Sequence, residues 1–240
     1  MTTAVIVQAR MGSTRLPGKV LASIAGAPML VRVVERAGKI AGVDELVVAT
    51  SSSSIDDPIA ELADARGWRL TRGSEHDVLA RYLEAARAVD ASVIVRVTAD
   101  CPLLDPGVGG RVVAALDGGR AADYASNTQV RTYPRGLDVE ALTREALERS
   151  ARDARAPAAR EHVTWHVYQH PEAFRLLDVT SPDDRSALRW TVDTPADLEL
   201  ARRLYAAVGT TDFTYADALA AWDRDPTLAD VNAHVAQKAT

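Results

Sequence analysis

The sequence predicts an open α/β sandwich, in which a mostly parallel sheet carries helices on both faces. Near-continuous apolar runs, such as AVIVQ at 4–8 and SVIVRVTAD at 92–100, are typical of strands that are buried on both faces. Segments with apolar residues at helical spacing lie between such runs, as in DVLARYLEAARAV at 77–89. This alternation indicates successive strand–helix units, and ligands of such folds bind beyond the carboxyl ends of the strands.

The elements of the first half follow one another in a regular order. Pro28 opens a helix, because proline is favoured in the first helical turn. Asp105 and Pro106 mark a further helix start. The predicted elements are a strand at 4–8, a helix at 28–40, a strand at 45–51, a helix near 57–66, the short segment WRLTRG at 68–73, a helix at 77–89 and a strand at 92–100.

The pattern changes after about residue 123, where a polar, turn-rich stretch begins. The predicted elements of the second half are helices at 141–151 and 158–169, a strand FRLLDVT at 174–180, a strand LRWTVD at 188–193, a helix at 195–208 and a less regular helical end. We therefore expect a single domain over 1–240, in which 127–180 form a small inserted lobe.

The composition of the chain limits the possible binding partners and the cellular compartment. The chain has a net charge of −5 and no run rich in lysine or arginine, which argues against a nucleic-acid partner. No apolar run is long enough to span a bilayer, and no secretory signal is readable at the start. A single cysteine, Cys101, fits a reducing compartment. We expect a cytoplasmic protein without a membrane partner.

The loop after the first strand concentrates glycine and positive charge, in Arg10, Gly12, Ser13, Arg15 and Lys19. Backbone amides in such a loop can cradle phosphate, and the cations can neutralise its oxygens. The loop is not a Walker A motif, because it is one residue too long and has a valine in place of the metal-binding hydroxyl, and it is not GxGxxG. A solvated connection is the alternative, but the local charge favours a small anionic ligand.

Two aspartates, Asp100 and Asp193, end predicted strands from distant parts of the chain. Beside a polyphosphate these carboxylates would repel the ligand unless a cation stood between them. Mg²⁺ suits that place, because it takes few carboxylates together with substrate phosphates. As alternatives, Asp100 is a turn or cap residue, and Asp193 or Thr194 caps the helix that begins at Pro195.

His162, His166 and His170 recur at helical spacing, which resembles a stripe of metal ligands. No cysteine accompanies them and aromatic residues lie between them, so a partly buried structural face is favoured. Cys101 has no neighbouring base in the sequence, and we predict no nucleophile there.

Five segments occur in the order found in the cytidylyltransferases that activate acidic sugars: IVQARMGSTRLPGKVL, RGSEHDVLARY, RVTADCPLLDP, RGLDVEAL and RWTVDTPADLELA. Over 4–208 the chain most resembles the spore-coat polysaccharide branch, and more distantly the synthetases of CMP-sialic acid and CMP-ketodeoxyoctonate. The resemblance implies a Rossmann-like nucleotidyltransferase fold, CTP as donor, Mg²⁺ as cofactor, pyrophosphate release and a homodimer. Its acceptor would be an acidic sugar or similar small acid, whose identity is not inherited because the distant synthetases have Lys-Asn where this chain has Lys19-Val20.

The resemblance also implies roles for residues in the matching segments. The implied nucleotide-binding residues are Ala9, Arg10, Gly12, Ser13, Arg15, Lys19, Arg72, Ser74, Arg81 and Thr98. The residues implied for catalysis are Arg10, Arg15, Lys19 and Asp100. Asp100 and Asp193 match metal-binding aspartates, and Gly136, Asp138 and Glu140 lie in a stretch that resembles the acceptor-side and dimer-forming region.

Two other kinds of function stay open from the sequence. A nucleotidyltransferase could use another NTP, or a phosphonate or sugar-phosphate acceptor, but such enzymes usually open with a glycine-richer GGxGTRL loop, where this chain has Arg10. A nucleotide-binding subunit without catalytic activity is disfavoured, because both aspartates and all three loop cations are present.

Overall fold

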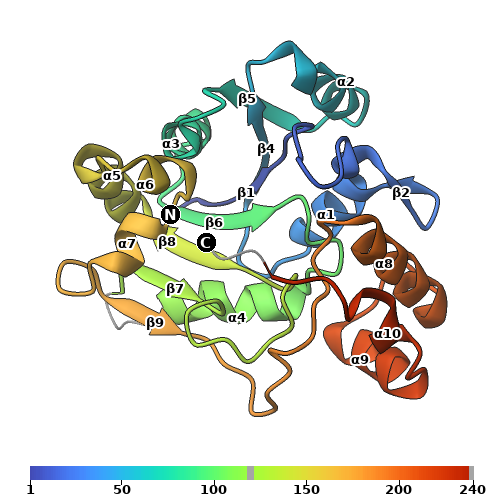
Figure 1. The fold of residues 1–240 in the computed structure, drawn as a ribbon. Helices are drawn as coiled ribbons and strands as arrows, with labels where there is room; N and C mark the ends of the chain where they lie inside the picture. Colours follow the sequence, from blue (N-terminus) through green and yellow to red (C-terminus); the bar gives the residue numbers. More distant parts are fainter. Residues whose placement is uncertain (118–121, 238–240) are drawn as a thin grey trace.

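The computed structural model describes residues 1–117 and 122–237, and its centre is a seven-stranded sheet of order β5-β4-β1-β6-β8-β7-β9 (Figure 1). Its strands are β1 (Thr3–Gln8), β4 (Glu45–Ser51), β5 (Arg69–Gly73), β6 (Val93–Thr98), β7 (Tyr124–Ser126), β8 (Glu140–Thr143) and β9 (Leu176–Asp178). A two-stranded hairpin of β2 (Ser23–Ile24) and β3 (Ala27–Pro28) lies beside it, and the 3₁₀ turns are η1 (Lys19–Leu21) and η2 (Ser54–Asp56).

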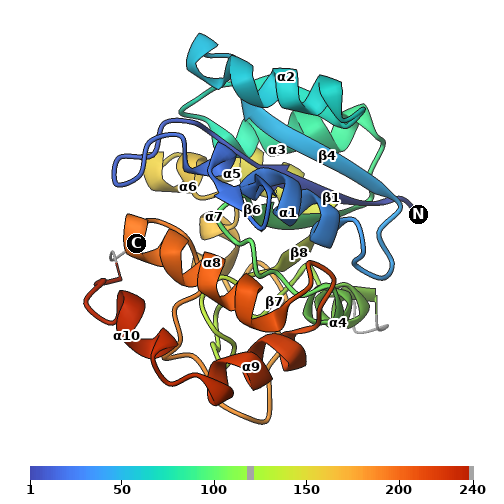
Figure 2. The same ribbon diagram turned by 90° about the vertical axis from the view of Figure 1, so that its right-hand side faces the viewer.

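Helices cover both faces of this sheet. The helices are α1 (Met29–Ala37), α2 (Asp57–Ala65), α3 (Val78–Ala88), α4 (Pro106–Asp117), α5 (Arg144–Asp153), α6 (Pro157–Glu161), α7 (Trp165–Gln169), α8 (Pro195–Val208), α9 (Tyr215–Arg224) and α10 (Leu228–Asn232). One apolar core joins the sheet to α1, α2, α4 and α8, and the other joins it to α3, α5, α6 and α7. Helices α9 and α10 pack against α8 (Figure 2).

Strand β1 shows why an apolar run predicted this architecture. Val5 and Val7 belong to one core, Ala4 and Ile6 belong to the other, and all four side chains are fully buried. Successive side chains of a strand point to opposite faces, so a strand covered on both sides is apolar throughout. The predicted α/β sandwich with a mostly parallel sheet is confirmed.

The register of the central strands places the loops that follow them. β1 is parallel to β4 and to β6, and Gln8 at the end of β1 lies opposite Thr98 at the end of β6. Strand β8 is antiparallel to both of its neighbours, β6 and β7. Because β1 and β6 end at the same level, the loops after them leave the sheet side by side.

Two predicted helices differ from the structure. The helix predicted over 141–151 is wrong at its start, where Glu140–Thr143 form β8; a strand of four residues is too short for its period to be recognised. Thr143 then caps α5, since its Oγ1 accepts the amide of Ala146 at 3.1 Å. The helix predicted over 158–169 is two short helices, α6 and α7.

The strand predicted over 188–193 is also wrong. Among the described residues, this segment forms only an isolated bridge between Arg189 and Arg135. Its amides pair with loops: Trp190 N donates to Arg135 O at 2.7 Å, and Val192 N donates to Asp100 O at 2.9 Å. These bonds, and not a strand ladder, bring the end of the segment to the carboxyl end of β6.

The segment expected as an inserted lobe, 127–180, contributes both to the sheet and to its surroundings. It supplies β8 and β9 to the main sheet, and helices α5, α6 and α7 to one face. Among the described residues, none of the helices has the length and apolar character needed to cross a bilayer.

Candidate active site

Three segments meet at the carboxyl ends of β1 and β6. They are the loop after β1, the turn after β6 that holds Asp100, and the residues just before α8 that include Asp193. Figure 2 shows the loop after β1 at the end of the molecule opposite the N terminus. This is the edge where open α/β sheets bind their ligands.

Lys19 joins the two predicted metal aspartates. Its Nζ lies 3.0 Å from Asp100 Oδ2, 2.8 Å from Asp193 Oδ1 and 2.7 Å from the carbonyl oxygen of Val192. Burial alone would lower the pKa of Lys19, but the carboxylates of Asp100 and Asp193 outweigh it and hold the pKa above its ordinary value. The lysine is therefore a buried cation that depends on both carboxylates.

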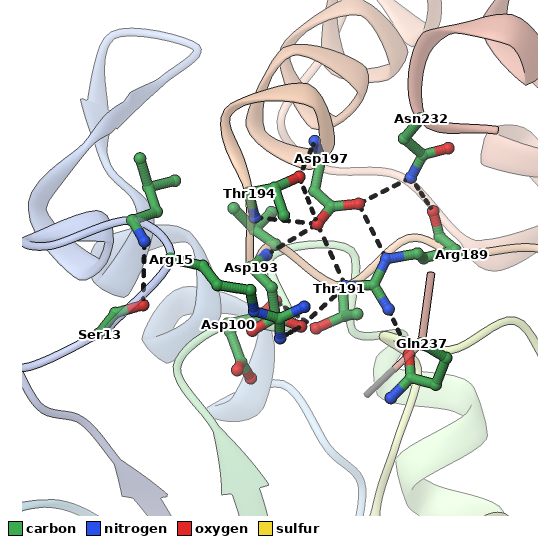
Figure 3. Close-up of polar contacts among 12 residues, drawn as sticks. Ser13, Arg15, Asp100, Arg189, Thr191, Asp193, Thr194, Asp197, Asn232 and Gln237 are labelled. Carbon is green, nitrogen blue, oxygen red and sulfur yellow. Dashed lines mark hydrogen bonds and ion pairs between the residues drawn. The ribbon is translucent and has the colours of Figure 1, made fainter. Parts of the chain in front are cut away.

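Asp193 receives two further cations (Figure 3). Arg15 lies 2.9 Å and Arg189 lies 2.8 Å from its Oδ2. Burial would raise the pKa of Asp193, but hydrogen bonds from Lys19 and Arg189 keep it below its ordinary value. Because Arg189 also pairs with Asp197 at 2.9 Å, three cations face three carboxylates at this junction, and their formal charges balance.

The residues that cap the neighbouring helices are not the aspartates of the site. Thr194 is the N-cap of α8 and its Oγ1 accepts the amide of Asp197, so Asp193 does not cap that helix. At the start of α4, Asp105 Oδ1 accepts the amide of Val108 at 2.7 Å. Asp100 instead accepts hydrogen bonds from Thr98 Oγ1 and Lys19 Nζ. Thr194 is therefore the cap of α8 and Asp193 is not, while Asp100 does lie in the turn after β6 but uses its carboxylate to bind Thr98 and Lys19.

The two aspartates fit a divalent cation. Both present an oxygen within 3.0 Å of the same Lys19 nitrogen, so a single cation can be spanned by the pair. Mg²⁺ prefers oxygen ligands, and it is usually bound by one or two carboxylates together with phosphate oxygens and water. A cation here would replace the lysine ammonium between the carboxylates and free the lysine for phosphate.

The loop after β1 presents backbone donors as well as cations. Within the described residues, the amides of Arg10, Gly12, Thr14 and Arg15 have no hydrogen-bond acceptor in the protein. Gly18 closes the loop in a left-handed conformation, with φ of 71°. Such amides beside arginine and lysine form an anion-binding arrangement.

Asp56 holds this loop in place, a role that was not predicted from the sequence. Its Oδ1 accepts the amide of Met11 at 2.7 Å, while its Oδ2 accepts the hydroxyl of Ser51. The side chain is buried at the start of α2. An aspartate just before a helix is usually taken as a cap, so no pattern in the sequence could reveal its contact with Met11.

Two clefts adjoin the paired carboxylates. The first has a volume of about 340 Å³ and the second about 580 Å³. Both are lined by Thr98, Asp100, His162 and Asp193. His162 therefore lies at the junction of the clefts, although a structural face was favoured for the three histidines. The rings of His166 and His170 lie 4.1 Å apart with their planes tilted by 40°, and they line neither cleft.

Most residues predicted for nucleotide binding line the first cleft. They are Ala9, Arg10, Ser13, Arg15, Lys19, Arg81 and Thr98. Arg81 is 2% exposed, and burial lowers the pKa of its guanidinium. Gly12 lies in the same loop but does not line the cleft.

Arg72 and Ser74 bond to neighbouring loops and line neither cleft. Arg72 Nε donates to the carbonyl of Ser51 at 2.9 Å, and its guanidinium pairs with Asp57 at 2.8 Å. Ser74 Oγ accepts the amide of Asp77. Both residues therefore shape the loops beside the first cleft.

The second cleft contains Asp138 and Glu140 among its lining residues. Asp138 forms a two-pronged ion pair with Arg131, at 2.6 and 2.9 Å. Glu140 is buried and bonded to Arg96, Tyr124 and Thr164; burial would raise its pKa, but Arg96 holds it below the ordinary value. Both carboxylates are thus already engaged.

Gly136 shapes the second cleft from behind. It has a φ of 107°, and a Cβ at this position would lie 2.5 Å from Thr191 N. The loop of Gly136 can therefore approach the Trp190–Thr191 backbone only because the residue is a glycine. The close approach allows the loop of Gly136 to pack against the backbone of the segment that ends at Asp193.

A family model described as cytidylyltransferase matches residues 4–218. The spore coat polysaccharide biosynthesis protein SpsF of Bacillus subtilis is 35% identical over 233 residues, which cover 93% of this chain and 95% of that protein. A 3-deoxy-manno-octulosonate cytidylyltransferase of Anaeromyxobacter sp. strain K is 32% identical, covering 85% of this chain and 98% of that protein.

Solved structures show the same architecture. A cytidylyltransferase of Leptospira borgpetersenii superposes with a TM-score of 0.91 at 33% identity, covering 95% of this chain and 96% of that one. A CMP:2-keto-3-deoxy-manno-octonic acid synthetase, solved with CTP, shares the fold with a TM-score of 0.65 at 24% identity, covering 86% of this chain and 99% of that one.

Proposed function

The chain belongs to the cytidylyltransferase family, and we propose that it transfers CMP from CTP to a small acidic acceptor, such as an acidic sugar, with Mg²⁺ as cofactor and release of pyrophosphate. One observation carries the proposal. Lys19 joins Asp100 and Asp193 at the point where two clefts meet, with Arg15 beside them. A donor in one cleft and an acceptor in the other would meet at these charges.

The first cleft suits the triphosphate of CTP. Arg10, Arg15 and Lys19 supply positive charge, and the amides of the loop after β1 supply donors for phosphate oxygens. As the bond between the α- and β-phosphates breaks, negative charge grows on the departing pyrophosphate. Cations held at the wall of the cleft stabilise that charge.

Asp100 and Asp193 would hold the Mg²⁺ ion. When bound, Mg²⁺ neutralises phosphate charge and lowers the pKa of an attacking hydroxyl. Thr98 donates a hydrogen bond of 2.6 Å to Asp100 Oδ1 and so fixes the orientation of that carboxylate.

The second cleft suits an acidic acceptor. Its lining carboxylates are paired with cations, whereas Arg135, which also lines it, has no acidic partner within the described residues. Burial and the nearby Arg131 guanidinium lower the pKa of Arg135, against the effect of Asp138. A carboxylate on the acceptor would pair with this arginine.

The reaction needs little from the protein beyond position and charge. An oxygen of the acceptor attacks the α-phosphorus of CTP and forms a new O–P bond, while the bond to the β-phosphate oxygen breaks and pyrophosphate leaves. Holding the two reactants in adjoining clefts makes the attack effectively intramolecular. A subunit without catalytic activity would have no use for this junction.

We also propose a homodimer in the cytoplasm, with 127–180 as the acceptor-side and dimer-forming region. Val130, in the loop after β7, is 52% exposed and is one of three large apolar side chains so exposed among the described residues. Light scattering at micromolar concentration tests the dimer, and a monomer would contradict it.

The function is tested by measuring pyrophosphate release with each of the four NTPs and a panel of acidic acceptors that includes 3-deoxy-manno-octulosonate. We expect release with CTP, Mg²⁺ and at least one acidic acceptor. Equal rates with all four NTPs would remove the cytidylyl assignment, and release only with neutral or phosphorylated sugars would remove the acidic acceptor.

A further inference from the structure

The last described residues, up to Gln237, reach the second cleft and lie beyond the part that the family model matches. The match ends at residue 218, whereas α10 and the residues after it reach the site and Gln237 lines the cleft. Figure 3 shows Asn232 and Gln237 on either side of Arg189. We call residues 228–237 the C-terminal segment.

Asn232 is the buried anchor of the C-terminal segment. It is 6% exposed, and its Nδ2 donates to the carbonyl of Arg189 at 2.9 Å and to Asp197 Oδ1 at 2.9 Å. A buried amide with two well-placed acceptors holds its partners in a defined geometry. The two residues that it holds are the same two that support Asp193.

Arg189 supports the side chain of Asp193, and Asp197 supports its backbone. Arg189 donates to Asp193 Oδ2 at 2.8 Å, and Asp197 Oδ2 accepts the amide of Asp193 at 3.1 Å. Arg189 also pairs with Asp197 at 2.9 Å and donates to Gln237 Oε1. The C-terminal segment thus contacts the supports of Asp193 at two points, Asn232 and Gln237.

We propose that the C-terminal segment positions the Asp193 carboxylate for the metal and the nucleotide, with Asn232 and Gln237 as positioning residues that act through Arg189 and Asp197. The proposal rests on the proposed function, since it assigns Asp193 to the metal. Partners behind a metal-binding carboxylate orient it, and their loss costs on the order of 10-fold in metal affinity.

A purely structural role would give a different result. If Asn232 only tied α10 to α8, its loss would lower stability and leave metal binding by the folded protein unchanged. Metal affinity measured apart from turnover therefore separates the two roles.

The experiment uses the full chain with CTP and Mn²⁺ as the metal probe, and electron paramagnetic resonance measures the Mn²⁺ left in solution. The variants are Asn232→Leu, which keeps size and removes both hydrogen bonds, and Gln237→Ala, which changes an exposed side chain. His234→Ala, exposed on the same segment, is the matched control. Calorimetry measures CTP binding without metal.

We expect Asn232→Leu to weaken Mn²⁺ binding by about 10-fold and Gln237→Ala by a smaller factor, with the control unchanged and metal-free CTP binding intact. Unchanged Mn²⁺ affinity in folded Asn232→Leu, whatever its melting temperature, would overturn the proposal. If that variant does not fold, Gln237→Ala decides, and an affinity equal to the control overturns the proposal. Wild-type protein that fails to bind Mn²⁺ with CTP would overturn the proposed function, and this inference with it.

Discussion

Lys19 and Asp193 are 174 residues apart in the chain, and their side chains are joined by an ion pair of 2.8 Å. The same ammonium lies 3.0 Å from Asp100. This contact links the loop after β1, the turn after β6 and the segment before α8. It makes Lys19 a cation that can pair with either the carboxylates or a phosphate.

Removing a cation from the first cleft should weaken CTP binding. Arg15→Ala deletes a guanidinium that lies 2.9 Å from Asp193 and lines the cleft. A hydrogen bond to a charged group contributes about 1.5–3 kcal/mol, so affinity should fall by roughly 10- to 100-fold. Calorimetry with CTP measures the change.

Arg66→Ala, at the exposed end of α2, is the control for Arg15→Ala. It removes the same charge from the protein at a place outside both clefts. Equal losses in the two variants would show that overall charge, and not contact with phosphate, explains the effect.

Asp197 should make stability depend on pH below about 4. Burial would raise its pKa, but hydrogen bonds from Arg189 and Asn232 hold the pKa below the ordinary value of 3.8. The ionised form is thus favoured in the folded state, and the stability that it contributes at neutral pH is lost as the pH falls through the folded pKa. Asp197→Asn should unfold more easily at pH 7 and show a weaker acid dependence, measured by denaturant melts from pH 7 to 3.

Asp217→Asn provides the matched comparison for Asp197→Asn. Asp217 occupies the same capping-box position in α9 and is exposed, and a backbone hydrogen bond to Thr214 lowers its pKa. Its substitution should change the acid dependence less, because no buried guanidinium faces it. An equal effect in both helices would assign the pH dependence to capping alone.

The fold could be predicted from the sequence because burial on both faces leaves a direct trace in apolar runs. Val5, Val7, Ala4 and Ile6 carry that trace in β1. Strand β8 left no such trace, because four residues are too few to show a period. The segment before α8 is apolar like a strand, but its backbone amides pair with loops. Long buried strands can therefore be predicted from the sequence. Short strands and bridged loops cannot, because they depend on contacts between residues that are distant in the chain.

Part of the candidate site could also be predicted, because some of its residues follow the strands that are recognisable in the sequence. The parallel strands β1 and β6 are followed by the segments that hold Arg15, Lys19 and Asp100. The sheet topology alone therefore brings these residues to one edge. Arg189, Asp56 and Asn232 are distinguished only by their partners, Asp193, Met11 and Asp197, which no local pattern identifies. Residues that support a site are thus harder to predict than residues that face its ligand.

Arg135 should govern the acceptor and not the nucleotide. Arg135→Gln removes the charge that has no acidic partner among the described residues of the second cleft. Loss of a charged contact with the acceptor should raise its KM by roughly 10-fold or more, while the KM for CTP stays the same. Arg155→Gln, exposed in the same 127–180 segment, is the control, and parallel changes in both KM values would contradict the assignment.

Asp100 should separate turnover from nucleotide binding. Asp100→Asn keeps the size of the side chain and weakens metal ligation, so turnover should fall about 100-fold or more if the metal supplies ~3 kcal/mol of the barrier. Metal-free CTP binding should be retained or strengthened, because a carboxylate beside the triphosphate has become neutral. Melting temperature, metal-free CTP affinity and turnover are measured on one preparation.

The contacts of Asp100 decide how that result is interpreted. Its Oδ1 accepts a hydrogen bond from Thr98 and its Oδ2 accepts one from Lys19. An asparagine can keep one of these as an acceptor but places an amide against the other donor, so some loss of stability is expected even without metal. Thr98→Val, which removes the hydroxyl and leaves the carboxylate, should cost stability with a smaller loss of turnover. Normal turnover of Asp100→Asn in excess Mg²⁺ would remove the metal assignment, and equal turnover losses in both variants would reduce Asp100 to a structural role.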